Sequence, residues 1–141
     1  MGLLTFIKQD LRRKHEVFLG DGSNISFFRV LFTDGTSANV IYRLALACSK
    51  YKVLAPLALI FQHINRIYNG CTIGVKSTSE IGFVLMHPVG VVINSSVKMG
   101  RNITIESGVV IGAEKGLSPI LGNNVFIGAG AKIIGNVTVG D

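Results

Sequence analysis

The first seventy residues place apolar side chains at the three- and four-residue steps of amphipathic α-helices. In the stretch 37–51 the apolar stripe consists of Val40, Ile41, Leu44, Ala47, Cys48 and Tyr51. In the next stretch it consists of Leu57, Ile60, Phe61, Ile64, Ile67 and Tyr68. Shorter helical patterns occupy 3–15 and 23–32. We therefore predict an α-helical N-terminal region over residues 1–70.

Capping residues set the expected bounds of the two longer helices. Ser37 is of the type that caps helix N-termini, so we expect it to begin the first. Pro56 stands where a first helical turn tolerates proline, and Gly70 stands where a helix C-terminus favours glycine.

From about Cys71 the repeat changes to six residues. Aliphatic residues stand six apart, and they resume in the same phase after one ten-residue step: Ile93, Met99, Ile105, Ile111, Leu121, Ile127, Ile133 and Val139. Neither an α-helix nor a single strand has this period, whereas a coil of three short strands does, with one hexapeptide on each face. The region 71–141 is therefore predicted to be a parallel β-helix, with the aliphatic residues filling a narrow prism.

The ten-residue step contains the sequence "AEKGLSPI" at 113–120. We expect it to be a loop that projects from one face and helps to build a binding site. A tolerated surface insertion is the alternative. The chain stops in mid-pattern at "NVTVGD", so we expect either a truncated chain or another element that covers this end.

Composition places the chain among folded proteins. Of its 141 residues, 48% are hydrophobic and 16% charged, which is too apolar for a disordered chain. The longest apolar run, 53–61, is about half of a bilayer span. Cys48 and Cys71 lie on different predicted elements and suit neither a disulfide framework nor a metal site, so we expect a cytoplasmic protein.

The net charge of +6 comes largely from the N-terminal region. Lys8, Arg12, Arg13 and Lys14 form a basic cluster. This cluster is either a solvated helix face or, beside an apolar stripe, a surface for peripheral attachment to the inner membrane. No aromatic interleaving or zinc spacing accompanies it, so no nucleic-acid partner is expected.

One histidine interrupts the aliphatic run "GFVLMHPVGVVIN" at 82–94. Counting back six residues from Ile93 places His87 at an interior position, where an unpaired polar group costs about 1–3 kcal/mol. It is either a buried, hydrogen-bonded side chain or a functional one. A neutral imidazole is well matched to removing a proton from a hydroxyl at neutral pH. His15 and His63 fall on the predicted helices, so no metal site is expected.

Several segments resemble the serine acetyltransferase branch of the hexapeptide-repeat acyltransferases, namely "HPVGVVIN", "TIESGVVIG" and "IGAGAKIIGNVTVG". The N-terminal segments "DLRRK" and "NVIYRLALAC" resemble the subgroup that acetylates exopolysaccharides, the colanic-acid type. The resemblance implies a left-handed β-helix and a homotrimer. It also implies acetyl-CoA as cosubstrate in a groove between neighbouring copies, and His87 as the general base.

The same resemblance assigns further residues. It implies that small residues and one lysine bind the cofactor: Gly112, Ala113, Gly128, Ala129 and Lys132. The acceptor is expected to contact Thr72, Asn94, Glu106 and Ser118.

The chain also departs from the family's pattern. Met86 stands where serine acetyltransferases have an Asp before the histidine, and Leu117-Ser118 replaces an Arg-His pair before Pro119. Thr72 stands where the family has the Asp that pairs with the histidine, so we expect Thr72, a backbone carbonyl or water to orient His87. A site that binds a free amino acid needs charged side chains to pair with both its ammonium and its carboxylate group.

These departures favour a neutral acceptor. The predicted function is therefore O-acetylation of a saccharide hydroxyl in capsule or exopolysaccharide synthesis. Two alternatives stay open: serine O-acetylation in cysteine biosynthesis, and a non-catalytic trimeric scaffold.

Overall fold

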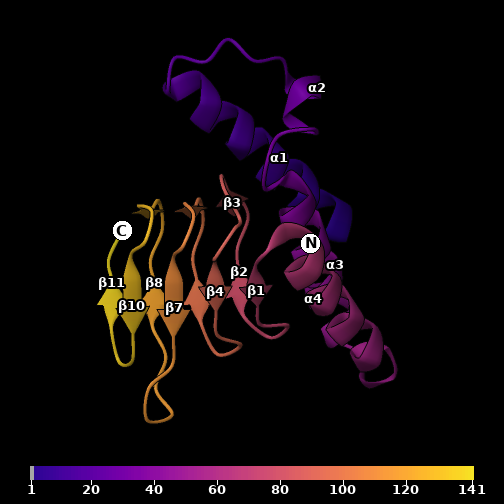
Figure 1. The fold of residues 1–141 in the computed structure, drawn as a ribbon, viewed down its shortest axis with the longest axis vertical. Coiled ribbons are helices and arrows are strands. Elements are labelled where there is room, and N and C mark those ends of the chain that lie inside the picture. The colour runs from indigo at the N-terminus through magenta and orange to yellow at the C-terminus, as the bar shows by residue number, and fades with distance from the viewer. Residues whose placement is uncertain (1) are drawn as a thin grey trace.

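The helical pattern of the N-terminal region folds into helices that pack at one end of a β-helix in the computed structural model, which describes residues 2–141 (Figure 1). The helical elements are α1 (Leu3–Gly20), α2 (Phe27–Val30), α3 (Thr36–Ser49), the 3₁₀ turn η1 (Lys52–Leu54) and α4 (Ala55–Asn69). Pro56 lies in the first turn of α4, and Gly70 ends that helix with a φ of 68°, as predicted.

The start of α3 differs from the prediction. Gly35, not Ser37, is the N-cap, and its φ of 79° lies in the left-handed region that favours glycine. A Cβ at this position would collide with the backbone carbonyl of Leu85. Ser37 lies inside the helix and donates instead to the side chain of Asn69, at 2.6 Å.

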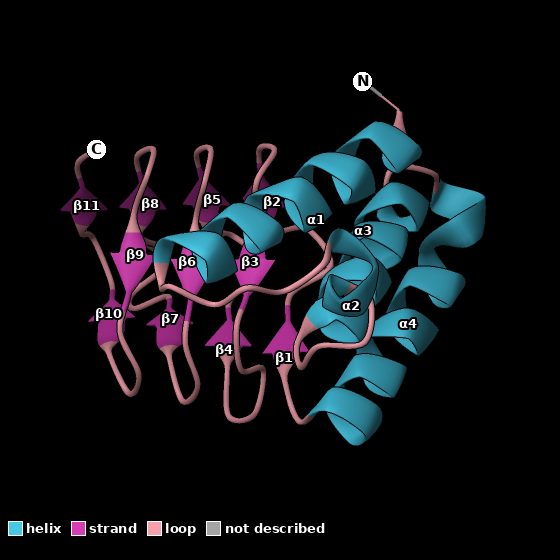
Figure 2. Cartoon of the chain, turned by 90° about the horizontal axis from the view of Figure 1, so that it is seen from above, coloured by secondary structure: helices cyan, strands magenta, loops and turns pink. Residues whose placement is uncertain are grey.

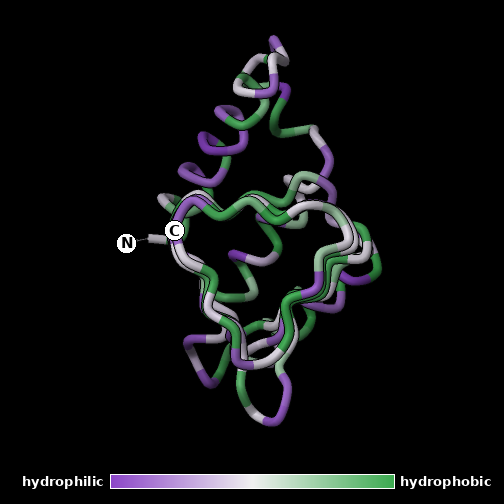
Figure 3. Tube along the Cα trace, turned by 90° about the vertical axis from the view of Figure 1, so that its left-hand side faces the viewer, coloured by the Kyte–Doolittle hydropathy of each residue, from purple (hydrophilic) through white to green (hydrophobic). Residues whose placement is uncertain are grey.

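The hexapeptide region forms a three-sided parallel β-helix of eleven short strands. The first sheet contains β1 (Thr72–Ile73), β4 (Val92–Ile93), β7 (Val110–Gly112) and β10 (Lys132–Ile134). The second contains β2 (Thr78–Ser79), β5 (Lys98–Met99), β8 (Ile120–Leu121) and β11 (Thr138–Val139). The third contains β3 (Val84–Leu85), β6 (Thr104–Ile105) and β9 (Phe126–Ile127). Seen along the axis, the coils superpose as a triangle (Figure 3).

The predicted interior positions are confirmed. Ile93, Met99, Ile105 and Ile111 are at most 4% exposed, as are Leu121 and Ile127. Ile133 and Val139, in the last coil, are partly buried against this core. Fully burying an aliphatic side chain stabilises the fold by about 1.5–3 kcal/mol, so each of these interior positions contributes on that scale.

The first coil has no coil beneath it, and side chains from the helices pair its carbonyl groups. In a parallel ladder alternate residues turn their backbone groups to opposite neighbours: Thr72 bonds the following coil, so Ile73 and its counterparts on the other faces present their carbonyls to the open end. Donors from α1, α3 and α4 bond the carbonyl oxygens of residues 73, 77, 79, 80, 83 and 85. They come from Gln62, Tyr42, Arg43, Asn39 and Lys14. The helices therefore close this edge of the β-helix.

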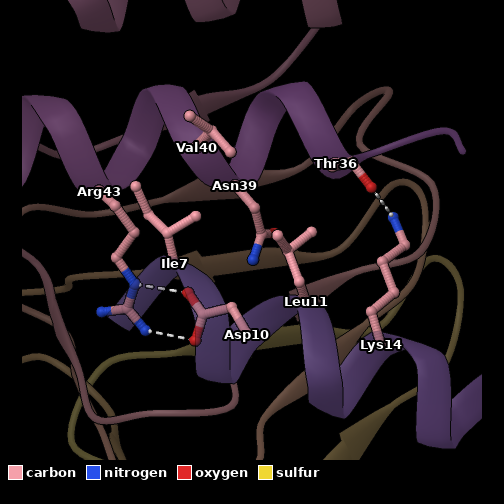
Figure 4. Close-up of a pocket in the computed structure, with 8 residues that line it drawn as sticks. All are labelled: Ile7, Asp10, Leu11, Lys14, Thr36, Asn39, Val40 and Arg43. Carbon is pink, nitrogen blue, oxygen red and sulfur yellow. Dashed lines mark hydrogen bonds and ion pairs between the residues drawn. The ribbon is translucent and has the colours of Figure 1, made fainter. Parts of the chain in front are cut away.

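A buried ion pair fixes α1 and α3 in this position (Figure 4). The carboxylate of Asp10 accepts from Nε of Arg43 at 2.7 Å and from a terminal guanidinium nitrogen at 3.0 Å. It also accepts from the backbone N–H groups of Gly82 and Phe83, at 2.9 and 3.0 Å. The cavity beside the pair, between α1 and α3, measures about 10 Å³. That volume is close to the lower limit for one water molecule.

The basic cluster predicted on α1 is only partly a solvated face. Lys8 and Arg12 are exposed, Arg13 pairs with Glu16 at 3.3 Å, and Lys14 is buried between α1 and the β-helix. The prediction of four basic residues on one surface is thus wrong for Lys14, whose ammonium finds acceptors inside the protein. Within residues 2–141, none of the helices combines the length and the apolar character needed to cross a membrane.

Replacing Asp10 with Ala should lower the free energy of unfolding by about 3–5 kcal/mol, because Arg43 is left buried and unpaired. Urea denaturation followed by circular dichroism measures this. Arg12→Ala, an exposed change on the same helix, is the control and should alter stability by no more than about 0.5 kcal/mol. Equal stability of both variants would show that the ion pair does not hold the helices in place.

Candidate active site

His87 lies at an edge of the prism and not inside it. Leu85 takes the interior position and pairs in register with Ile105, and it is fully buried. The first residues of β3 and β4 are eight positions apart, whereas those of β6 and β7 are six apart. The turn 86–91 therefore holds two extra residues. Counting back by six fails for His87 because these two residues shift the phase of the repeat, so the histidine does not take the aliphatic position.

The partner of His87 comes from the helical region. Nδ1 of His87 lies 3.0 Å from Oδ2 of Asp34, in the short connection between α2 and α3. Both side chains are more than half exposed, 59% for His87 and 58% for Asp34. The alternative of a buried, hydrogen-bonded histidine is thus excluded. Thr72, predicted as one possible orienting group, lies instead in β1, where it lines a hollow with Gln62, His63 and Arg66.

This pairing decides which ring nitrogen is available. A carboxylate only accepts, so a neutral His87 paired with Asp34 carries its proton on Nδ1 and donates it to Oδ2. The lone pair of Nε2 then faces away from Asp34 and can take a proton from a ligand.

Three successive coils stack other predicted residues along the edge that carries His87. We call this the His87 edge; it consists of the turns 86–91, 106–109 and 128–131, between the third sheet and the first. The strand register places Glu106 one coil above Met86, and Gly128 one coil above Glu106. Ala129 follows in the same turn, and Lys132 begins the next strand of the first sheet. The acceptor residue Glu106 and three cofactor residues thus share an edge with His87.

The remaining predicted residues lie on a different edge, between the first sheet and the second. We call it the loop edge; it consists of the turns 94–97, 113–119 and 135–137. Asn94 and Ser118 lie here, and both bond the hydroxyl of Ser96. Gly112 ends β7, and Ala113 begins the loop that projects from the coil (Figure 1). Within one copy, the structure does not bring these four residues to His87.

The C-terminal half of α1 crosses the third sheet (Figure 2). Between the two lies a hollow of about 380 Å³, which Glu106 of the His87 edge helps to line. Its walls carry charged groups from both elements: Arg13, Glu16 and Asp21 on one side, Glu106 on the other. Phe126, 65% exposed, contributes an aromatic surface. Among residues 2–141, no group accepts a hydrogen bond from Nε of Arg13, although this atom is buried. The hollow therefore offers charged groups of both signs.

Two features of this site have no clear signal in the sequence. Asp34 lies 53 positions before His87, and its local context "TDGT" reads only as a turn between helices. Arg13 stands in a run of basic residues that reads as a solvated face. A weak signal for the shifted phase exists in Pro88 and Gly90, since turn-forming residues here suit a wider corner.

No protein-family model matches the chain. A serine acetyltransferase of Helicobacter pylori is 35% identical over 116 residues, 79% of this chain and 67% of that protein. A serine acetyltransferase of Bacillus subtilis is 33% identical over 140 residues, 96% of this chain and 63% of that protein. The WcaB protein of Escherichia coli, named for acetyl transfer in colanic acid biosynthesis, is 36% identical over 109 residues, 70% of this chain and 67% of that protein. The chain thus spans less than two thirds of the Bacillus relative.

Solved structures agree with the fold described above. The soybean serine acetyltransferase apoenzyme superposes with a TM-score of 0.84 at 26% identity, covering 99% of this chain and 57% of that one. A serine acetyltransferase in complex with CoA gives a TM-score of 0.88 at 24% identity, covering 99% and 58%. These matches confirm the predicted left-handed β-helix with an N-terminal helical region. Together with the identity shared with the Helicobacter protein, they show that the chain belongs to the hexapeptide-repeat acyltransferase family, which includes the serine acetyltransferases.

Proposed function

We propose that this protein is an acetyl-CoA-dependent O-acetyltransferase in which His87 is the general base. The observation that carries the proposal is the His87–Asp34 pair, at 3.0 Å on an exposed edge. An acceptor hydroxyl is a poor nucleophile at neutral pH, and Nε2 of His87 removes its proton as the oxygen attacks the acyl carbonyl. The C–S bond of the thioester then breaks, and the imidazolium returns the proton to the departing CoA sulfur. Asp34 keeps the ring in the required tautomer. Acetyl-CoA supplies an activated thioester, so no protein nucleophile is needed.

The residues proposed for the cofactor suit an extended ligand. Gly128 has an ordinary backbone conformation, and a Cβ there would meet nothing closer than a Phe126 ring carbon at 4.0 Å. Neither the turn nor its own packing therefore requires glycine at this position. Gly128 and the exposed Ala129 leave the backbone open to a pantetheine chain. Lys132, exposed at the start of β10, is placed to meet a phosphate.

Serine is the acceptor that we propose first, in place of the saccharide that the sequence favoured. The serine acetyltransferases among the relatives support it. The hollow between α1 and the third sheet supports it as well, since Arg13 suits a carboxylate and Glu106, on the His87 edge, suits an ammonium group. Arg13 and Glu106 do not occupy the positions at which the family has its charged residues. At those positions this chain has Met86 and Leu117-Ser118.

A saccharide is the second candidate. Met86 and Ser118 still replace the family's charged residues, and the WcaB relative carries a colanic acid name. Phe126 lines the same hollow and offers a ring face on which a sugar can stack. Peripheral attachment to the inner membrane belongs with this candidate, with Lys8 and Arg12 as its exposed basic residues.

We further propose that the complete site forms between copies in a homotrimer. Asn94, Ser118, Gly112 and Ala113 lie on the loop edge, away from His87 in the same copy. A neighbouring copy that sets its loop edge against the His87 edge would unite the two sets of residues around one groove.

Replacing His87 with Ala should lower kcat by about 10²–10⁴-fold, the usual contribution of a general base. Asp34→Asn should lower it by about 10–10²-fold, because the ring loses the partner that fixes its orientation. Release of CoA thiol measures both rates. His63→Ala and Glu80→Gln, which alter exposed pairs elsewhere, are the controls and should retain the wild-type rate. Full activity of His87→Ala would show that His87 is not the general base. A wild type that acetylates no acceptor would favour the scaffold.

Arg13→Met should raise KM for L-serine by about 10–10²-fold, since a hydrogen bond to a charged group is worth about 1.5–3 kcal/mol. The adjacent exposed Arg12→Met is the matched control. Initial rates with L-serine and with a panel of sugars measure the preference. Turnover of sugars alone would reject serine and leave the saccharide.

Mixing two inactive variants tests the shared groove. His87→Ala damages one edge and Ala113→Trp the other, so random mixed trimers should regain up to about a quarter of the sites intact. Mixing His87→Ala with the double variant gives no intact site and serves as the control. If mixed trimers form and stay inactive, the site lies within a single copy.

A further inference from the structure

We infer that Lys14 of α1 is a positioning residue for the His87–Asp34 pair: its buried ammonium holds the backbone of Asp34 against β3, the strand that leads into His87. This inference rests on the proposed role of His87. It concerns a residue that takes no part in binding acceptor or cofactor.

The ammonium of Lys14 joins both halves of the pair. Its Nζ donates to the backbone carbonyl of Asp34, to the carbonyl of Leu85 at 2.9 Å, and to Oγ1 of Thr36 at 3.2 Å. Leu85 is the second residue before His87 in the chain. An ammonium has three donors, and all three are used. One side chain thus sets the distance between the backbone that carries the carboxylate and the backbone that carries the imidazole.

Packing between α1 and α3 does not explain a lysine here. Ile7 and Leu11 precede Lys14 on the same face of α1, and they line the same small cavity (Figure 4). A third aliphatic residue would extend that contact without the cost of burying a charge. Lys14 is nevertheless 2% exposed, and burial lowers its pKa to about 8, an effect that the nearby charge of Asp34 opposes. At neutral pH the group remains a cation.

The close contact between the connection 34–35 and β3 explains why a cation is buried here. Gly35 lies so close to β3 that a Cβ would strike the carbonyl oxygen of Leu85. The carbonyls of Asp34 and Leu85 therefore point to one site, where their negative ends repel each other. A positive charge between them turns this repulsion into attraction. The other side chains that close the first coil bond its carbonyls, whereas Lys14 also bonds the connection that carries Asp34.

Fixing the backbone matters because the pair itself is exposed. An ion pair at the surface is weak, since holding two mobile side chains together costs entropy. Asp34 has a short side chain, so anchoring its backbone leaves few rotamers that reach Nδ1 of His87. Lys14 thus favours the tautomer with the proton on Nδ1.

Lys14→Met tests this role, with Lys8→Met, an exposed lysine on the same helix, as the matched control. We expect kcat to fall by about 10-fold, with both KM values within about twofold, because positioning acts on the chemical step. Long-range ¹H–¹⁵N spectra of the His87 ring should change from the Nδ1–H tautomer to a mixture. In an Asp34→Asn background, Lys14→Met should cost no further activity, because both act through one contact.

Two outcomes would overturn the inference: an equal loss of rate in both backgrounds, or an unchanged tautomer in Lys14→Met. If the Met variant does not fold, Lys14→Gln, which keeps a donor, replaces it. A mixture of His87 tautomers in this variant supports the inference, and an unchanged tautomer overturns it. The spectra need no substrate. A wild type without acyl transfer would therefore refute the proposed function, while the tautomer still reports on Lys14.

Discussion

The unpaired carbonyls of the first coil are the constraint on which this structure depends. The first coil of a parallel β-helix has a neighbouring coil on one side only, so the backbone groups on its other side, carbonyls and N–H groups alike, need other partners. Here α1, α3 and α4 provide side-chain donors for that edge, and the Asp10–Arg43 pair holds the first two of these helices together. The helical region therefore covers the open end of the β-helix through side-chain hydrogen bonds. Because this region must fit the coil residue by residue, it also fixes the connection that carries Asp34.

This arrangement joins stability to chemistry. Gly35 and Lys14 contact β3 for reasons that belong to the closure of the edge, and the same contacts bring a carboxylate to the ring of His87. The β-helix contributes the other part, a straight edge on which Glu106 and Gly128 stack above the histidine turn. The two regions of the chain each provide one half of the pair.

Much of this could be predicted from sequence, and the limit has a physical cause. The six-residue repeat reports the interior of the prism directly, because only an apolar residue can face it, and Ile105 and Ile111 are buried as expected. His87 was found as an interruption of that repeat. Counting by six alone puts it at an aliphatic position, which the structure does not show, because that count assumes a turn of constant length. Asp34 and Arg13 could not be found, since tertiary contacts between distant segments leave no periodic trace.

The two extra residues of the turn 86–91 have a wider consequence. A perfectly regular solenoid looks alike at every level, so a ligand sliding along its edge would find many equivalent stops. On the His87 edge, one corner longer than the others breaks that translational symmetry and distinguishes its level from the levels above it. An active site must differ from the equivalent levels around it. A short insertion that bulges outward creates this difference while the interior residues stay in register.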